Sequence, residues 1–283
     1  MGTNINFKKH LGLSGGGASI QLPSGGNLLL DLYPNAALAY SLRKLSSSFS
    51  GNPIRVRRSN DNAEQDIPFN GEDLDTTNLL AFVGANDGYI TTWYDQSGNA
   101  NNAAVTSAVW QAKIVSSGVV ETDNVNSKPT SVWATDKYDF TNVVLTQEYY
   151  LISKFRRVDK FTNYITFIAS SATSPRILSW ATNGSGNQYV TNVGAQAAFG
   201  SSTSQGTFTI ETYRQDDGEM FLFRNNVQQG TTPNRTTTGS NLNRFGARGA
   251  TRTTGEVQEL IYWNNDMFTN RADIYTNVDT YYQ

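Results

Sequence analysis

Cysteine is absent from the 283 residues of this chain. Disulfide bonds, thiolate nucleophiles and zinc–thiolate sites are therefore excluded, and the fold has to be held by packing and hydrogen bonds. Charge is also scarce, because charged residues make up 16% of the chain, against about a quarter in a typical soluble domain. The 22 Lys and Arg and the 24 Asp and Glu give a net charge of −2. We therefore expect no nucleic-acid partner, because binding phosphates requires a basic surface.

Histidine occurs once, as His10, in a Gly-rich stretch. A Ser-His-Asp relay or a histidine metal site needs a rigid scaffold around that residue, so we predict neither and assign no metal or cofactor. A calcium site with oxygen ligands stays open at Asp216 and Asp217, although a hairpin turn is the better interpretation of these acids. No apolar run approaches the roughly 18 residues of a membrane span, and no secretory signal follows the first lysines. We expect no membrane partner.

Glycine gathers near the start of the chain, at residues 15–17 and 25–26. Such stretches have little intrinsic shape, so we interpret residues 1–34 as an arm that is ordered where a partner holds it. Residues 35–283 are then the folded domain. The candidate assembly contacts of the arm are its apolar residues, Phe7, Leu11, Leu13, Ile20 and Leu22.

Apolar residues at helical spacing predict three helices. The first begins after Asn35 and carries Leu38, Leu42, Leu45 and Phe49. The second lies between Asp75, which can cap its first turn, and Gly84, which can end it. The third closes the chain and carries Ile274, Val278 and Tyr281.

An apolar period of two indicates many short strands. Asp217-Gly218 is the clearest hairpin turn among them. Short strands separated by Gly, Asn and Ser turns predict an all-β fold, a two-sheet antiparallel jelly-roll sandwich with a few short helices and an N-terminal arm. The strand candidates are residues 54–58, 89–94, 113–120, 130–134, 149–155, 164–170, 176–182, 188–193, 207–214, 219–227 and 256–263.

Paired carboxylates are the enzymatic alternative, because glycoside hydrolysis needs two acids across a cleft. The nearest approach to the Glu-x-Asp-x-x-Glu pattern of a jelly-roll glucanase, residues 121–126, lacks the last acid. Glu256 and Glu259 are three apart on a strand, so we expect them on opposite faces, with Glu259 buried and hydrogen-bonded. For glycan binding, the candidates are an aromatic platform at Trp110 and the polar groups of Asp95 and Asn99.

Two stretches resemble the start of the fungal-type arabinofuranosidase B catalytic domain. They are residues 39–67, AYSLRKLSSSFSGNPIRVRRSNDNAEQDI, and residues 91–103, TTWYDQSGNANNA. That family similarly pairs a Tyr-Ser-x-Phe-Ser-Gly stretch with a Tyr-Asp-Gln-Ser-Gly-Asn stretch. The ending, residues 255–283, is similar to the last strand and closing helix of concanavalin- and laminin-G-like jelly rolls. The three-part combination also resembles proteins of tailed-phage structural modules.

The resemblance implies the scaffold of that family, but two parts of its active site have no counterpart. The family has a vicinal disulfide in its sugar pocket, and this chain has no cysteine. The family's nucleophile lies in a strand of the Trp-Val-Met-x-Asp-x-Glu-Asn type, which is absent here, and residues 164–206 are nearly free of acids. The shared stretches therefore predict a scaffold without the reaction.

We accordingly predict a non-enzymatic structural protein of a phage virion, as a capsid decoration, head fibre or tail component. It would assemble through its arm with other virion proteins and with copies of itself, because contacts on a symmetric lattice offset the cost of ordering the arm. Two alternatives from other classes stay open. One is a carbohydrate-binding adhesin module that grips a host surface glycan, and the other is an arabinofuranosidase-type glycoside hydrolase.

Overall fold

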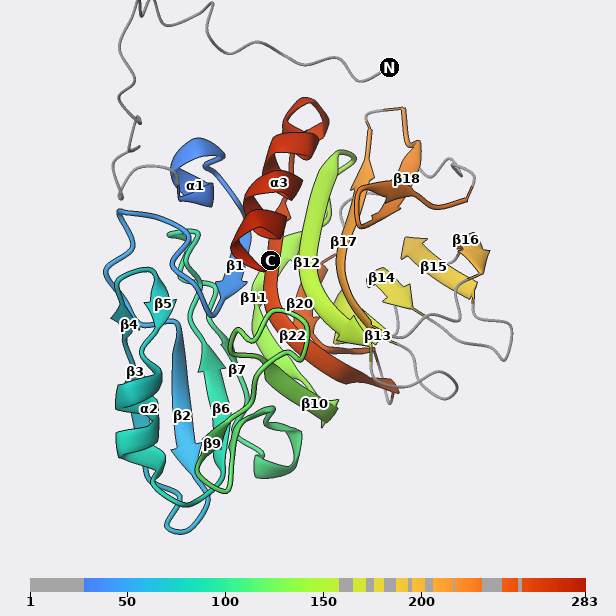
Figure 1. Ribbon diagram of the computed structural model, residues 1–283. Helices are drawn as coiled ribbons and strands as arrows, with labels where there is room; N and C mark the ends of the chain where they lie inside the picture. The colour runs from blue at the N-terminus through green and yellow to red at the C-terminus, as the bar shows by residue number, and fades with distance from the viewer. Residues whose placement is uncertain are drawn as a thin grey trace, which may run out of the picture.

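The computed structural model describes residues 28–157, 165–171, 176–180, 187–192, 195–201, 206–215, 217–230, 241–248 and 251–283. Across these residues the predicted all-β architecture is confirmed, with antiparallel strands in two layers and three short α-helices (Figure 1). The predictions for the Gly-rich arm fall outside the described residues, and they concern His10, Phe7, Leu11, Leu13, Ile20 and Leu22.

Strand β22 (Thr251–Trp263) is the spine of the first layer. One edge of β22 pairs with β12 (Tyr149–Arg157). On its other edge, the C-terminal half pairs with β1 (Leu38–Ser41) and the N-terminal half with β10 (Ser131–Asp136). Beyond β12 the layer continues through β17 (Gly206–Arg214), β18 (Met220–Arg224) and β19 (Val227–Gln228).

The second layer is centred on β11 (Tyr138–Val144) and β20 (Asn241–Phe245), which pair with each other. From β20 it continues through β13 (Ile165–Ala169), β14 (Arg176–Trp180), β15 (Asn187–Asn192) and β16 (Ala195–Ser201). From β11 it continues through β7 (Ala103–Ala104), β6 (Gly88–Trp93), β2 (Ile54–Arg58) and β3 (Glu64–Ile67). Strand β8 (Lys113–Ser116) joins the two layers, because it pairs with both β6 and β10.

Smaller elements decorate the layers. The described ones are β4 (Phe69–Asn70) with β5 (Asp73–Leu74), β9 (Val119–Val120) beside β8, β21 (Ala247–Arg248) beside β22, and the 3₁₀ helices η2 (Ala108–Trp110) and η3 (Phe268–Asn270).

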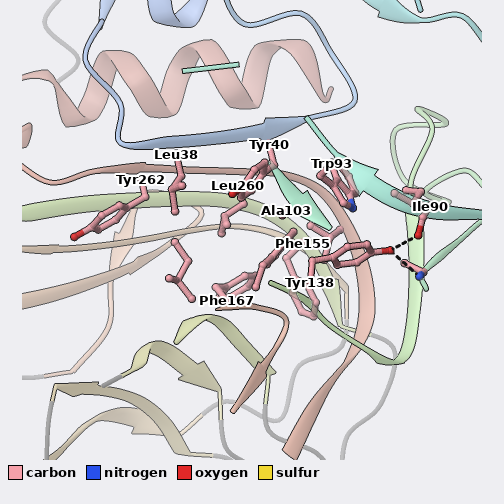
Figure 2. Packing of buried hydrophobic residues seen from close by; sticks show 14 of the residues in the cluster. Leu38, Tyr40, Ile90, Trp93, Ala103, Tyr138, Phe155, Phe167, Leu260 and Tyr262 are labelled. Carbon is pink, nitrogen blue, oxygen red and sulfur yellow. Dashed lines mark hydrogen bonds between the residues drawn. The ribbon is translucent and has the colours of Figure 1, made fainter. Parts of the chain in front are cut away.

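The main apolar core fills the space between the two layers (Figure 2). Phe245 of the second layer stacks on Tyr40 of the first, with 5.7 Å between the ring centroids. The hydroxyl group of Tyr138 shows how a polar atom is accommodated there. It donates to the carbonyl of Ile90 at 2.9 Å and accepts from the amide of Ala112 at 2.8 Å. Large buried aromatic rings stabilise the sandwich in place of disulfides.

A second apolar cluster lies on the opposite face of the first layer, beneath the C-terminal helix α3 (Arg271–Tyr281). Ile274 and Val278 of α3 are buried in it, as are two leucines of the short helix α1 (Leu29–Leu32). Residues 29–32 therefore pack on the body of the molecule, while the division into arm and domain at residue 34 stays a prediction. Among the described residues, no helix has the length and apolar character needed to cross a membrane.

The helix predicted after Asn35 is wrong, because Leu38–Ser41 form strand β1. All four residues of β1 are buried. Leu38 and Tyr40 face the core between the layers, while Ala39 faces the α3 cluster. A strand buried on both faces carries a nearly continuous apolar run, which cannot be told from a buried helix by its spacing.

The second predicted helix is confirmed as α2 (Thr76–Val83). The carboxylate of Asp75 accepts from the Asn78 amide at 2.9 Å, and Gly84 ends the helix with a φ of 62°. The closing helix is confirmed as α3, and the predicted hairpin as β17 and β18. Gly218 adopts a φ of 89° in its turn, a conformation that glycine reaches at little cost.

A β-bulge in β22 changes the faces predicted for two acids. Gln258 is skipped in the pairing with β12, which leaves Lys154 opposite Glu259 and Arg156 opposite Glu256. Lys154 and Arg156 are two apart on a regular strand, so their side chains share one face. Glu256 and Glu259 therefore also share a face, the one that α3 covers in part. The prediction of opposite faces is wrong because one extra residue shifts the alternation.

Candidate functional site

A cleft of about 760 Å³ lies where α1, the loop at residues 46–51 and the loop at residues 96–101 meet. Asn142 of β11 and Asn264, which follows β22, complete its wall. This volume is in the range of small-molecule sites. Among the residues that the structure describes, the lining contains amides, hydroxyls and one aromatic ring, and no Asp, Glu, Lys, Arg or His.

The turn that follows β6 builds one wall of the cleft. Asp95 is almost fully buried, and its carboxylate accepts from the Ala39 amide at 2.9 Å and from the Asn101 amide at 3.0 Å. Its two oxygens also accept from the amide and the hydroxyl of Ser97. The Asp95 carboxylate therefore stabilises the turn, and Asp95 does not line the cleft. Asn99 is exposed in the cleft, with its amide nitrogen donating to the Ala36 carbonyl at 2.9 Å.

Gln96 joins the two stretches that resemble the arabinofuranosidase domain. Its amide nitrogen donates to the carbonyls of Ser41 and Arg43, at 3.0 and 2.9 Å. Its amide oxygen accepts from the Leu45 amide at 2.8 Å. The side chain is buried, so these three bonds fix the turn against the start of the 46–51 loop. The two stretches thus meet at one cleft.

Helix α1 fixes the same loop from the other side. The Asp31 carboxylate accepts from the Ser46 hydroxyl at 2.9 Å and from the Ser47 amide at 3.0 Å. The Ser46 and Ser48 hydroxyls lie 2.8 Å apart. These bonds hold the loop without a charged group reaching the cleft, because Asp31 is not part of the lining.

Three asparagines of the cleft have side-chain amides that are available to a ligand. The side chains of Asn35, Asn142 and Asn264 are exposed and make no hydrogen bond within the described part of the chain. Each amide offers two donors and an acceptor. The cleft can therefore form several hydrogen bonds with an uncharged ligand.

Trp110 lies apart from this cleft. It belongs to η2, is half-buried, and has the ammonium group of Lys137 4.0 Å from its ring centroid. The structure thus brings Asp95 and Asn99 together in one turn and leaves Trp110 elsewhere. Glycan binding at these three residues stays a prediction.

The acids of β22 and the loop after β9 form a separate group. Oε1 of Glu256 accepts from Arg156 Nη1 at 2.5 Å, while Oε2 is buried and has no hydrogen-bond partner in the described part of the chain. Burial raises the pKa of Glu256, Arg156 opposes this shift, and Asp123 and Glu121 add to it. Glu256 is thus a buried, ion-paired carboxyl group with a raised pKa, and it does not line the cleft at residues 46–51 and 96–101.

Comparison with solved structures shows that the fold is shared with arabinofuranosidases. A GH54 α-L-arabinofuranosidase soaked with a cyclic sulfate inhibitor matches with a TM-score of 0.67 at 17% identity. A mutant of a GH54 α-L-arabinofuranosidase soaked with 4-nitrophenyl α-L-arabinofuranoside matches at 0.66 and 16%, and an arabinofuranosidase complexed with arabinofuranosyl-α-1,2-xylobiose at 0.63 and 13%. Each match covers 86% of this chain and 62% of the other chain. The shared property is the fold.

No protein-family model matches the chain, and no curated protein does. The chain spans 62% of the length of the arabinofuranosidases that it resembles. The resemblance to the arabinofuranosidase scaffold is thus supported by three-dimensional structure, and nothing in the comparisons concerns a phage particle.

The prediction of a non-enzymatic protein is corrected by these matches. It took the missing acid-bearing strand and the missing cysteines as evidence of a scaffold that performs no reaction. The arabinofuranosidases named above share this fold, so it is a fold on which those proteins carry out hydrolysis. Absence of one family's motif excludes that arrangement of acids and does not exclude another.

Sequence reasoning missed most of the cleft. Phe49 appeared as the last residue of an apolar stripe and was assigned to a helix face, whereas it lines the cleft from a loop. Asn142 and Asn264 carried no signal, because each lies far along the chain from the other lining residues. The signal that could have found the site was the shared motif pair itself, since its Ser-rich and Asn-rich residues supply two walls.

Proposed function

We propose that the protein is a carbohydrate-active β-sandwich that recognises neutral glycans in the cleft between residues 46–51 and 96–101. The observation that supports this is the uncharged lining, in which amides and hydroxyls lie beside small apolar side chains and a single aromatic ring. Sugar hydroxyls both donate and accept, as amides do, and a buried charge without a partner would be costly against an uncharged ligand. The arabinofuranosidase fold of the chain supports the same ligand class.

Calorimetric titration with arabinan and xylan oligosaccharides tests this proposal. The variant Asn142→Ala/Asn264→Ala removes two free amides and should weaken binding roughly tenfold or more, since each hydrogen bond contributes about 1 kcal/mol. Asn124→Ala, an exposed asparagine outside the lining, is the matched control and should bind as the unchanged protein does. Failure to bind any neutral glycan on an array, or equal affinity of the double variant, would overturn the proposal.

Arabinofuranosidase-type hydrolysis is a second candidate function, favoured by the fold shared with solved arabinofuranosidases, and Glu256 is its candidate acid. Glycoside hydrolysis requires a general acid with a raised pKa and a second carboxylate. The pKa of Glu256 is raised mainly by burial, and Glu121 lies within electrostatic reach. Release of nitrophenol from an aryl arabinofuranoside, reduced about a hundredfold or more in Glu256→Gln, is the expected result. No release by the unchanged protein would reject this candidate and leave cleft binding intact.

Location in a phage particle remains a proposal from the sequence, together with contacts to other virion proteins and self-association through residues 1–34. The apolar residues Phe7, Leu11 and Leu13 within a Gly-rich stretch support it. Changing Phe7 and Leu11 to Asp should abolish incorporation into particles while circular dichroism stays unchanged. Normal incorporation of that variant would contradict the proposal.

A further inference from the structure

We infer that Phe49 is the platform on which the cleft seats a sugar ring, an inference that rests on the proposed function. Phe49 is the one aromatic residue among the described residues that line the cleft. Its side chain is half-buried, so part of its ring is available. A flat aromatic face suits the C–H face of a sugar, while the surrounding amides suit its hydroxyls.

The ring of Phe49 packs against a second aromatic ring that lies outside the cleft lining. Phe69 packs edge-to-face against it, with 6.4 Å between centroids and 80° between planes. Phe49 lines the cleft and Phe69 does not, so Phe69 supports the ring from outside the lining. An aromatic pair of this geometry restricts the ring before any ligand arrives.

Gly51 provides the space into which the ring of Phe49 extends. A Cβ atom at residue 51 would lie 2.8 Å from Cζ of Phe49, which is closer than non-bonded carbon atoms approach one another. Glycine at this position is therefore required by the placement of the ring. Any larger residue at 51 would push the ring away from its present position.

The backbone that carries Phe49 is also fixed in advance. The Phe49 amide donates to the Ser46 carbonyl at 3.3 Å, and Ser46 itself is bound by Asp31. The amide of Leu45, one residue earlier, donates to the side-chain oxygen of Gln96. A binding residue on a loop that is held by such bonds loses less conformational freedom when a ligand binds.

The rest of the lining defines the class of ligand. The amides of Asn35, Asn142 and Asn264 can pair with hydroxyls, and no cation among the described lining residues could pair with a carboxylate or phosphate. The ligand that fits is one or two units of an uncharged sugar, with a ring face toward Phe49. Uronic acids, sialic acids and sugar phosphates do not fit this lining.

Titration of arabinobiose, xylobiose and digalacturonic acid into matched variants tests the inference. Phe49→Leu keeps the apolar volume without the flat ring and should weaken binding of the neutral disaccharide roughly tenfold. Phe49→Tyr keeps the ring and should bind within about threefold of the unchanged protein. Gly51→Ala should weaken binding as Phe49→Leu does, because it displaces the ring. Phe268→Ala, an exposed aromatic residue outside the cleft, is the control.

The outcomes separate the inference from the proposed function. If the unchanged protein binds a neutral disaccharide and Phe49→Leu binds it equally well, the platform is wrong and the proposed function stands. If the unchanged protein binds neither neutral disaccharide, the platform inference is overturned; if it also binds no neutral glycan on an array, or prefers digalacturonic acid, the proposed function is overturned with it. Thermal unfolding of each variant identifies any loss of binding that comes from a loss of folding, and Phe49→Tyr then decides the role of the ring.

Discussion

At the scale of single residues, the few charged groups of this molecule include several buried pairs. Nε of Arg43 donates to Oε2 of Glu259 at 2.7 Å, and the two side chains are 6% and 0% exposed. Burial opposes the charge of Arg43, but the attraction of Glu259 outweighs it, so the pKa of the guanidinium is raised. The Cζ atom of Arg43 lies 4.9 Å from the ring centroid of Tyr281. The pair ties the loop beside the cleft to β22 and α3.

Arg43→Met should lower the free energy of unfolding by about 3–5 kcal/mol, because it leaves the Glu259 carboxylate buried without its cation. The double variant Arg43→Met/Glu259→Gln removes that charge as well and should regain more than half of the loss. Urea denaturation of the three proteins measures both steps. A double variant no more stable than Arg43→Met would show that the uncompensated charge is not the cause.

Glu256 should make stability depend on pH. The pKa of Glu256 is raised in the folded state, mainly by burial. Glu256 therefore contributes its full share of stability below its unfolded pKa of about 4.3, and this stability is lost as pH rises through its folded pKa. Glu256→Gln should therefore flatten the fall in stability from acid to neutral pH. Urea midpoints across that range measure it, with exposed Glu64→Gln as control. Equal slopes in Glu256→Gln and the unchanged protein would contradict the prediction.

At the scale of elements, neighbouring residues decide where a helix begins and ends, whereas pairing between distant segments decides whether an apolar run forms a helix or a strand. Helix α2 begins and ends where its cap and its glycine predict, because both act on the adjacent turn. Strand β1 was predicted as a helix because both of its faces are buried, one by the core between the layers and the other by the cluster beneath α3, and its pairing partner β22 is remote in sequence. The bulge at Gln258 had no visible signal either, since it arises in the pairing of β22 with β12.

Asp75→Ala should lower the free energy of unfolding by about 1 kcal/mol, because α2 is short and loses the acceptor for the Asn78 amide. Thr77→Ala, at an exposed position within the same helix, is the matched control and should change stability by less than about 0.5 kcal/mol. Chemical denaturation of both variants measures the difference. Equal effects would mean that the cap contributes nothing beyond the loss of side-chain atoms.

At the scale of the whole molecule, aromatic contacts hold the two layers together. Phe245 of β20 contacts Tyr40, Trp93 and Trp133, with centroid distances of 5.7, 6.3 and 4.7 Å. These partners come from β1, β6 and β10, so one ring touches strands of both layers. Close packing across the interface therefore depends on this position.

Phe245→Ala should cost about 3–5 kcal/mol of stability, through lost burial and a cavity between the layers. Val227→Ala, at a position that is 63% exposed, should stay within about 0.5 kcal/mol of the unchanged protein. Thermal and urea unfolding measure both variants. A loss below about 1 kcal/mol for Phe245→Ala would mean that the layers repack around the gap.

The sequence by itself determined the all-β class, the cap at Asp75 and the hairpin turn at Asp217-Gly218, because each depends on residues that are neighbours in the chain. Tertiary structure alone decided that residues 38–41 are a strand, that Glu256 and Glu259 share a face, and that Phe49 lines a cleft with Asn264. Each of these depends on contacts between segments far apart in the sequence. Local spacing carries no information about such contacts, because the same apolar pattern can be satisfied by more than one set of partners.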